Sequence, residues 1–299
     1  MANQRSLAPS RAVIRDLYVP VLTPFDERGA ISGRALARHC EWIMGNGARG
    51  VMLFGTTGEG PSIGVAEKLD AIRALSVAQP DLPVIAAVMQ AALPEAIACI
   101  RGYNEFPLVG ILVLPPFFFR DADPAGITDF LATAAAASDH PVLAYHIPSL
   151  APEVPLDVAA IPGVWGVKDS GGDLGYTKAA LAAGNAVMVG AENTIPAAML
   201  AGAAGTIAGM ANLMPVELAA VCAAARAGDL ADAEARLKPV LQLRDQMMAG
   251  APGMEWIAAM KAIATHRHGI DLGGVRTPLR GTDDYLTAEI RRSVGAASE

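Results

Sequence analysis

Short apolar runs alternate with stretches of helical spacing along most of the chain. The apolar runs are bounded by Gly, Pro or charged residues, and they predict buried strands at residues 18–22, 50–54, 83–87, 109–114, 142–146, 164–168, 186–190 and 205–208. In the segments between these runs, the spacing of apolar residues predicts helices at about 33–44, 64–78, 94–103, 123–138, 173–182 and 195–201. The crossover after Pro155 is short and poorly marked. This alternation favours parallel βαβ units. Eight strands in roughly 200 residues predict an α/β fold, a (β/α)8 TIM barrel rather than an open doubly wound sheet.

The strand pattern stops after Ala211, and only helical spacing follows. It predicts helices at residues 215–227, 230–248, 254–268 and 284–294, separated by turns that contain Gly and Pro. The first of these can complete the barrel, and the others form a C-terminal helical extension. We therefore expect a flexible N-terminal tail at residues 1–12, a catalytic barrel at 13–227 and the extension at 228–299. Because no low-complexity linker precedes it, the extension is expected to pack on the barrel.

The composition narrows the function more than the fold. Hydrophobic residues make up 53% of the 299 residues and charged residues 18%, with a net charge of −7, which favours a compact enzyme and shows no sign of nucleic-acid binding. Three scattered cysteines and five histidines lack the spacing of a disulfide framework or a metal site. No Gly-x-Gly-x-x-Gly follows the first strand, and no apolar run reaches the ~18 residues that span a membrane. We expect a cytoplasmic enzyme without a metal or nucleotide cofactor.

The predicted sixth strand, residues 164–168, ends in a lysine. An amine at the end of an apolar strand loses hydration, and this makes it a better nucleophile toward carbonyls. Alternate residues of a strand share a face, so Val164, Gly166 and Lys168 are expected to point the same way, and Gly166 leaves room beneath the lysine stem. Trp165 and Val167 then point the other way. The alternative is a lysine that reaches out to solvent at the strand end.

Comparison of the lysines in the chain favours a nucleophile at this strand end over a lysine that reaches out to solvent. The chain has five: Lys68, Lys168, Lys178, Lys238 and Lys261. Lys68 is expected on the solvent side of an amphipathic helix, and the last three also lie in Ala- and Leu-rich helical stretches. Only Lys168 ends a strand, so it is the candidate for a Schiff base.

Other strand-end loops carry groups that could assist such an amine, because barrels place their sites at the strand C-termini. Residues 55–60 include glycines that free the backbone amides beside Thr56 and Thr57, which suits a carboxylate, although an ordinary Gly/Thr turn has the same pattern. Tyr145 ends the fifth strand and is a candidate proton relay, with a structural tyrosine as the alternative. Three phenylalanines at 117–119 must line a pocket or meet another subunit.

Six short motifs carry a resemblance to a known family. They are Val21-Leu22-Thr23-Pro24-Phe25, Gly55-Thr56-Thr57-Gly58-Glu59, Tyr145-His146-Ile147-Pro148, Gly166-Val167-Lys168-Asp169, Val189-Gly190 and Gly205-Thr206-Ile207. With them the chain resembles the dihydrodipicolinate synthase / N-acetylneuraminate lyase family of Schiff-base lyases over nearly its whole length. One motif alone would be weak evidence, but six in family order around a strand-end lysine are specific.

The resemblance implies a role for each matching residue. Lys168 would form the imine with a pyruvate-type 2-keto acid, whose carboxylate the Thr56 and Thr57 amides and hydroxyls would hold. Tyr145 would move the proton, with its phenol linked to the Thr56 hydroxyl. The remaining substrate-binding residues would include Gly58, Gly190 and Ile207. The resemblance also implies a homo-tetramer, a dimer of dimers, in which Phe118 approaches the neighbouring active site.

Two positions depart from the synthases of the family. A tyrosine that the neighbouring subunit contributes to the proton relay is replaced by Phe118, and an arginine that binds the carboxylate of the aldehyde is replaced by Leu150. Losing such a charged pair is worth about 1.5–3 kcal/mol. We therefore expect a carbon–carbon lyase or aldolase that acts on a 2-keto acid and an aldehyde. The alternatives are a keto-sugar-acid dehydratase or hydratase-aldolase with the same imine, and a dihydrodipicolinate synthase despite the missing arginine. A binding protein without turnover is disfavoured because Lys168, Tyr145 and Thr56 are all present.

Overall fold

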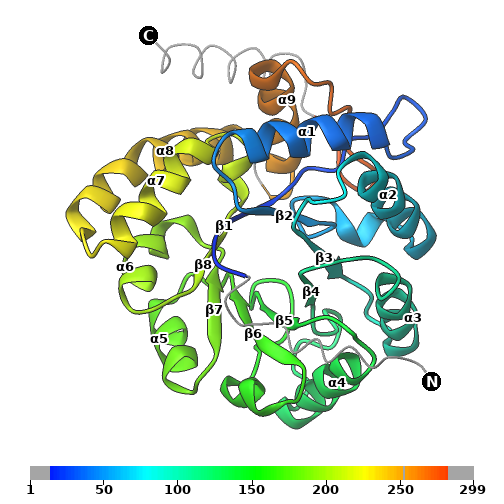
Figure 1. Ribbon diagram of the computed structural model, residues 1–299, viewed down its shortest axis with the longest axis vertical. Helices are drawn as coiled ribbons and strands as arrows, with labels where there is room; N and C mark the ends of the chain where they lie inside the picture. The colour runs from blue at the N-terminus through cyan, green and yellow to red at the C-terminus, as the bar shows by residue number, and fades with distance from the viewer. Residues whose placement is uncertain (1–13, 252, 282–299) are drawn as a thin grey trace.

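The computed structural model describes residues 14–251 and 253–281. Eight parallel strands close into a barrel in chain order, and each pairs with the next until β8 pairs with β1 (Figure 1). The strands are β1 Asp16–Pro20, β2 Gly50–Leu53, β3 Val84–Val88, β4 Gly110–Val113, β5 Val142–His146, β6 Val164–Asp169, β7 Ala186–Val189 and β8 Gly205–Ile207. The predicted (β/α)8 barrel is confirmed, and every strand lies within two residues of its expected place.

Helices surround the barrel as an outer ring (Figure 1). They are α1 Gly33–Gly45, α2 Val65–Ala78, α3 Leu93–Tyr103, α4 Pro124–Ala136, α5 Leu174–Ala182, α6 Ile195–Leu200, α7 Pro215–Arg226, α8 Leu230–Gly250 and α9 Trp256–His268. The weakly marked fifth crossover contains only the 3-10 helix Leu156–Ala160. The expected tail at 1–12 and the expected helix at 284–294 lie outside the described residues. None of the described helices is long and apolar enough to cross a membrane.

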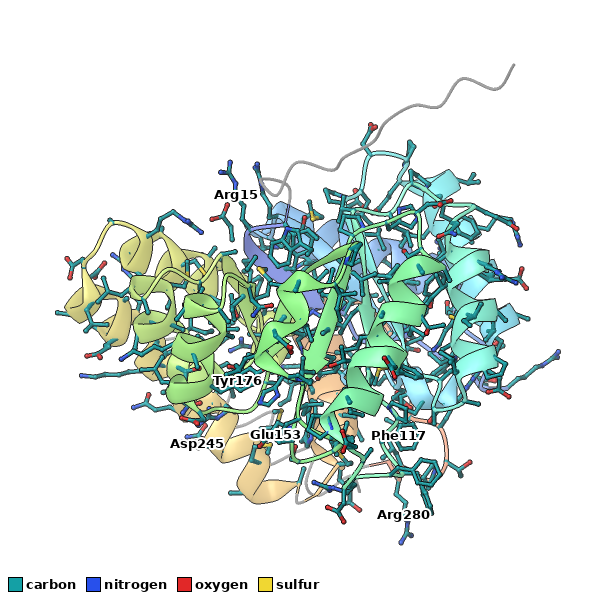
Figure 2. All side chains as sticks on the ribbon, turned by 90° about the horizontal axis from the view of Figure 1, so that it is seen from below. Arg15, Phe117, Glu153, Tyr176, Asp245 and Arg280 are labelled. Atoms are coloured by element: carbon teal, nitrogen blue, oxygen red, sulfur yellow. The ribbon has the colours of Figure 1, made fainter. Side chains whose placement is uncertain are left out.

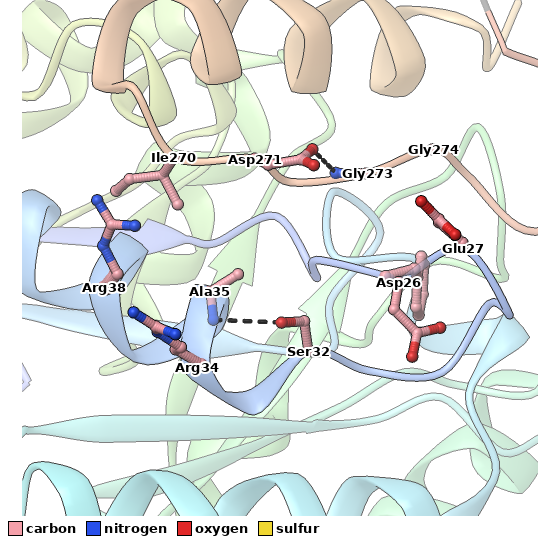
Figure 3. A pocket seen from close by; sticks show the side chains of 11 residues that line it. Asp26, Glu27, Ser32, Arg34, Ala35, Arg38, Ile270, Asp271, Gly273 and Gly274 are labelled. Carbon is pink, nitrogen blue, oxygen red and sulfur yellow. Dashed lines mark hydrogen bonds between the residues drawn. The ribbon is translucent and has the colours of Figure 1, made fainter.

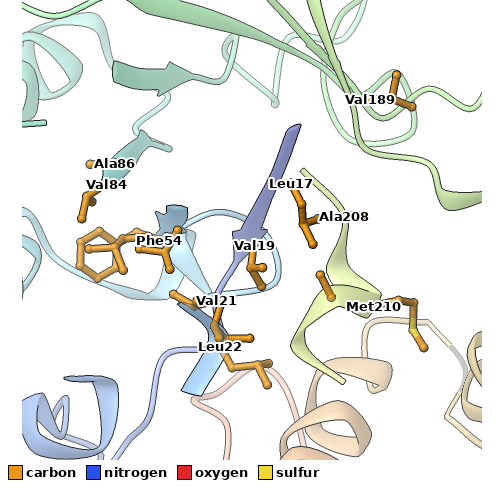
Figure 4. Packing of buried hydrophobic residues seen from close by; sticks show 14 of the residues in the cluster. Leu17, Val19, Val21, Leu22, Phe54, Val84, Ala86, Val189, Ala208 and Met210 are labelled. Atoms are coloured by element: carbon orange, nitrogen blue, oxygen red, sulfur yellow. The ribbon is translucent and has the colours of Figure 1, made fainter. Parts of the chain in front are cut away.

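Apolar side chains pack against both faces of the strands. On β1, Leu17 and Val19 belong to the large cluster between barrel and helices, part of which Figure 4 shows, whereas Tyr18 belongs to a smaller cluster inside the barrel. Strands buried on both faces appear in a sequence as continuous apolar runs. This is why the strands could be located from hydrophobicity alone.

Strand β6 departs from the regular alternation that we expected. Its pairing with β5 steps from Val142 opposite Val164 to Leu143 opposite Gly166, so β6 carries one extra residue, as a bulge does. Trp165 consequently packs inside the barrel, on the side where Lys168 lines a cavity, and not opposite to it.

The expected role of Gly166 was also wrong. A Cβ on Gly166 would lie 2.0 Å from the carbonyl oxygen of Ala186, so this glycine permits the close approach of β7 instead of making room for the lysine stem.

Lys68 is buried, so its expected position on the solvent side of its helix was wrong. Its relative exposure is 0%, and its Nζ has no hydrogen-bond partner among the described residues. The reason is tertiary: α3 packs beside α2, and its Cys99 lies close enough to act electrostatically on the Lys68 amine. Burial lowers the pKa of Lys68 to about 8.

The loops that follow the strands lie at one end of the molecule. Figure 2 shows Phe117, after β4, and Glu153, after β5, at the end opposite Arg15, which precedes β1. Asp245 of α8 lies toward this same end (Figure 2). Helix α8 also packs against the turn after β7, so the C-terminal extension reaches the strand ends of the barrel.

Candidate active site

Lys168 stands at the end of β6 and is 4% exposed. Strand pairing sets Tyr145 of β5 directly beside it, and the Lys168 Nζ lies 4.0 Å from the centroid of the tyrosine ring. The amine donates a hydrogen bond of 3.1 Å to the hydroxyl of Ser170. Lys168 is thus a buried amine in contact with a tyrosine ring and a hydroxyl, and its side chain does not extend into solvent.

Tyr145 connects this amine to the loop after β2. Its phenol oxygen lies 3.3 Å from the Thr56 hydroxyl, and the side chain is 2% exposed. Burial alone would raise the pKa of Tyr145. The charge of Lys168 and hydrogen bonds that include the one to Thr56 outweigh burial, so the pKa lies below its ordinary value. A phenol in this state can exchange a proton with a group at Lys168 more readily than an isolated tyrosine.

The loop after β2 is held in an unusual backbone conformation. Glu59 has a φ of 55°, in the left-handed region that non-glycine residues seldom occupy. Gly58 packs against the segment that follows β1, where its carbonyl accepts a 2.7 Å hydrogen bond from Thr23 and a Cβ would lie 2.8 Å from the carbonyl oxygen of Val21. These contacts leave Thr56 and Thr57 facing the cavity beside Lys168.

A buried ion pair fixes the same loop to the C-terminal extension. Glu59 Oε1 lies 2.6 Å from the Nζ of Lys261 on α9, and both side chains are almost fully buried. Lys261 also donates to the carbonyl of Gly274 at 2.6 Å, and the backbone N–H of Arg276 donates to Glu59 Oε2 at 2.8 Å. The sequence showed Glu59 inside a motif, but its partner stands about 200 residues away and carries no local signal.

The cavity at Lys168 has a volume of about 220 Å³. Six of the residues expected at the site line it: Thr56, Thr57, Tyr145, Lys168, Gly190 and Ile207. Gly58 and Phe118 are not among the lining residues, and Phe118 is 79% exposed. Whether Phe118 reaches a neighbouring site stays a prediction.

Sequence reasoning missed other residues of the cavity. Ser170 directly follows the Lys168-Asp169 motif, and Gly190 makes room for it, because a Cβ there would lie 2.0 Å from the Ser170 hydroxyl. Glu192 also lines the cavity, and α8 and α9 contribute further residues. The turn residues could have been suspected from their places after β6 and β7, whereas the helical ones could not.

The phenylalanine run is divided between solvent and a second cavity. Phe118 and Phe119 are 79% and 68% exposed, with their rings edge to face at 5.4 Å. Phe117 lines an apolar cavity of about 260 Å³ together with Leu150, and this cavity shares Thr56 with the one at Lys168.

Arg120, which follows the phenylalanines, does not line the cavity of Lys168. Its guanidinium donates to the carbonyls of Pro148 and Ser149 and so ties the loops after β4 and β5 together.

His146 has a structural role. It is 2% exposed, its ring stacks on Tyr176 at 3.5 Å, and its Nδ1 accepts the backbone N–H of Val154. Within the described residues no group of three or more His, Cys, Asp or Glu side chains could hold a metal ion.

The largest of these cavities, about 410 Å³, lies away from Lys168. It is bounded by Asp26, Arg34, Arg38 and Asp271, and Figure 3 shows the two arginines on α1 at one end and Asp26 with Glu27 at the other. It shares no lining residue with the cavity of Lys168, so volume alone does not identify the reactive site.

Comparison with known proteins agrees with this geometry. The chain matches the model of the Dihydrodipicolinate synthetase family over residues 14–297. It is 30% identical over 291 residues to an uncharacterized DapA-like lyase of Chloroflexus aurantiacus, a match that covers 93% of this chain and 95% of the relative. It is also 30% identical to the 4-hydroxy-tetrahydrodipicolinate synthase of Azoarcus sp. strain BH72 over 89% of this chain and 92% of that enzyme.

A solved structure extends the likeness to the fold. The N-acetylneuraminate lyase of Aliivibrio salmonicida superposes with a TM-score of 0.87 at 21% identity, over 95% of this chain and 97% of that one. The family match spans both the barrel and the C-terminal extension. The chain therefore belongs to the dihydrodipicolinate synthetase family of class I lyases and aldolases.

Proposed function

We propose that this protein is a lyase or aldolase that forms or breaks a carbon–carbon bond of a 2-keto acid through an imine on Lys168. The observation that supports this most is the contact of the buried Lys168 amine with Tyr145, whose phenol in turn meets the Thr56 hydroxyl. No other described lysine combines a strand-end position with a cavity.

The steps follow from the chemistry of these groups. The loop at Thr56 and Thr57 holds the carboxylate of the keto acid, and the Lys168 amine adds to its ketone with loss of one water to form the imine. The protonated imine accepts the electron pair of the adjacent bond, so an aldehyde leaves and an enamine remains. Tyr145 takes the proton from the hydroxyl that becomes the aldehyde carbonyl and returns a proton to the enamine carbon.

Borohydride trapping tests the imine. Incubation with pyruvate and borohydride is expected to add one adduct per chain, detected by intact mass and assigned to the peptide that contains Lys168. A Lys168→Arg variant should show no adduct, and Lys178→Arg, a change at an exposed lysine, should label like the wild type. Labelling at another lysine, or none with any 2-keto acid tried, would refute the mechanism.

The aldehyde half distinguishes this protein from the synthases. Because Leu150 cannot bind a carboxylate in the slot where they carry an arginine, condensation of pyruvate with aspartate semialdehyde is expected to be slow. Product analysis from a panel of 2-keto acids separates bond cleavage from loss or addition of water. An efficient synthase activity would show that the Leu150 slot does not decide the acceptor.

We also propose that the enzyme is a homo-tetramer built from dimers. Burying a phenylalanine is worth about 1.5–3 kcal/mol, and Phe118 and Phe119 project from the loop after β4 with most of their surface exposed. A second copy would cover them and bring Phe118 near its site. Light scattering of Phe118→Asp should show smaller particles than the wild type, because the new charge needs solvation. A wild type that is monomeric and active at micromolar concentration would contradict this assembly.

A cytoplasmic location is the remaining part of the proposal. The cysteines Cys40, Cys99 and Cys222 are all free and buried, as suits a reducing compartment. Cell fractionation with detection of the protein tests it, and recovery from the periplasmic or extracellular fraction would contradict it.

A further inference from the structure

The cavity around Lys168 has a second wall that the barrel does not supply. This wall comes from the C-terminal extension and consists of Arg244, Met247, Met248, Trp256 and Met260. The groups suited to the keto acid, Lys168 and Thr56, stand on the barrel side. The reacting bond joins the keto-acid half of the substrate to an aldehyde half. The aldehyde half must therefore lie against the wall of α8 and α9.

Most of this wall is apolar. Methionine side chains adapt to irregular apolar surfaces, and together with Trp256 they offer few hydrogen-bond partners. Hydroxyl groups pressed against such a surface would lose water without compensation. The wall therefore favours a hydrocarbon body over a polyhydroxylated one.

One charged side chain interrupts the wall. Arg244 is 26% exposed; its Nε and Nη2 lie 3.0 and 2.8 Å from Oδ1 of Asp245, and its Nη1 lies 4.0 Å from Oε2 of Glu192, too far for a hydrogen bond. Because the Asp245 side chain is 67% exposed, its pair with Arg244 contributes little free energy. A substrate carboxylate can replace Asp245, while Glu192 stays in place with its Oε1 accepting the backbone N–H of Met210.

Among the arginines that the structure describes, no other is placed to do this. Leu150 fills the slot of the synthase arginine and lines the apolar cavity of Phe117, and Arg120 is bound to two backbone carbonyls. Within the part of the chain that the structure describes, Arg244 is the only arginine that lines the cavity of Lys168.

We infer that the α8–α9 wall is the aldehyde subsite and that it takes an aldehyde with an apolar body and a remote carboxylate, which Arg244 binds. The inference rests on the proposed function. In the forward direction, the enamine carbon bonds to the aldehyde carbon, Tyr145 gives its proton to the resulting alkoxide, and water releases a 4-hydroxy-2-keto acid from Lys168. Every atom comes from the keto acid, the aldehyde and water.

Three acceptors with pyruvate as the donor test it: succinic semialdehyde, butanal and glyceraldehyde. We expect kcat/KM for succinic semialdehyde to exceed that for butanal by about 10- to 100-fold, as the loss of a charged hydrogen bond implies, and glyceraldehyde to be slowest. Arg244→Met should raise KM for succinic semialdehyde and so bring its kcat/KM close to that for butanal. Arg244→Lys should retain part of the preference. Arg236→Met, which removes an arginine of α8 whose partner is Asp232, is the matched control and should leave the preference unchanged.

Pyruvate trapping at Lys168, measured on the same proteins, separates the two proposals. Normal trapping combined with equal rates for all three acceptors, or with a preference that survives Arg244→Met, overturns the aldehyde subsite and leaves the imine mechanism intact. A wild type that is not trapped overturns the mechanism itself, and the subsite with it. If Arg244→Met cannot be trapped, its acceptor preference cannot be measured, and the KM of Arg244→Lys for succinic semialdehyde decides instead: a KM equal to that of the wild type overturns the subsite.

Discussion

Replacing Lys261 by methionine removes the only ammonium that contacts the buried Glu59 carboxylate among the described residues. Methionine has similar length and fills the space, so the substitution tests charge more than packing. Removing one partner of a buried ion pair costs about 3–5 kcal/mol, because the remaining charge stays buried and uncompensated. At this chain size each kcal/mol lowers Tm by about 2–4 °C, so a fall of roughly 6–20 °C is expected.

Two further variants show whether the pair itself is responsible. Glu59→Gln combined with Lys261→Met removes both charges and should recover most of the lost stability. Lys68→Met makes the same exchange at an equally buried lysine that has no hydrogen-bond partner among the described residues, and it should raise Tm. Relative to Lys68→Met, the wild type should gain stability as the pH rises from about 8 toward 10.5, because the folded wild type then releases the Lys68 proton while the unfolded chain still holds it. The advantage of Lys68→Met should shrink over that range.

Thermal unfolding followed by circular dichroism measures these effects, and steady-state kinetics adds a functional readout. Since Glu59 belongs to the loop of Thr56 and Thr57, Lys261→Met should raise KM for the keto acid more than it lowers kcat at temperatures where the variant is folded. The reasoning is refuted if Lys261→Met changes Tm by less than 2 °C, or if Lys68→Met is destabilised as much as Lys261→Met.

Three other predictions concern pH, strand packing and the proton relay. Burial lowers the pKa of His39 to about 4 and of His268 to about 3, so both are neutral in the folded protein; their contribution to stability is complete above pH 6.5 and is lost as the pH falls toward those values. Urea unfolding from pH 7 to 4 should show this loss, and His268→Phe should make it smaller. Gly166→Ala should yield little folded protein in expression and circular dichroism tests, because its Cβ would meet backbone of Ala186 that cannot move aside. Tyr145→Phe should lower kcat by about 10²- to 10⁴-fold while pyruvate trapping at Lys168 persists; an unchanged kcat would remove Tyr145 from the relay.

The fold and the meeting of Thr56, Tyr145 and Lys168 at one cavity could be predicted because their signals are local. Each strand is a short apolar run, and Thr56, Tyr145 and Lys168 stand at or just beyond the ends of such runs, which closure of the barrel brings together. The orientation of Trp165 could not be predicted, since the bulge in β6 depends on its pairing with β5. The burial of Lys68 depends on the packing of α3 against α2.

The contribution of α8 and α9 to the cavity could not be predicted, for a related reason. Arg244 and Trp256 lie in helices whose sequences show ordinary amphipathic or apolar spacing, and only the packing of α8 and α9 over the strand ends places them in the cavity. No motif marks a residue that reaches a site from a neighbouring helix. Such residues are therefore found from the structure alone.

The extension contacts both the loop of Thr56 and Thr57 and the cavity of Lys168, and helices α8 and α9 do so differently. Helix α9 carries Lys261, which holds the loop of Thr56 and Thr57 through Glu59, and the adjacent Met260, which lines the cavity of Lys168. Helix α8 carries Arg244, which has no contact with that loop among the hydrogen bonds and ion pairs of the described residues. Substitutions that shift α9 should therefore change KM for keto acid and aldehyde together, whereas Arg244 should affect the aldehyde alone. If Met260→Ala changes only one of the two KM values, α9 does not couple the halves, and the barrel loop holds its position without it.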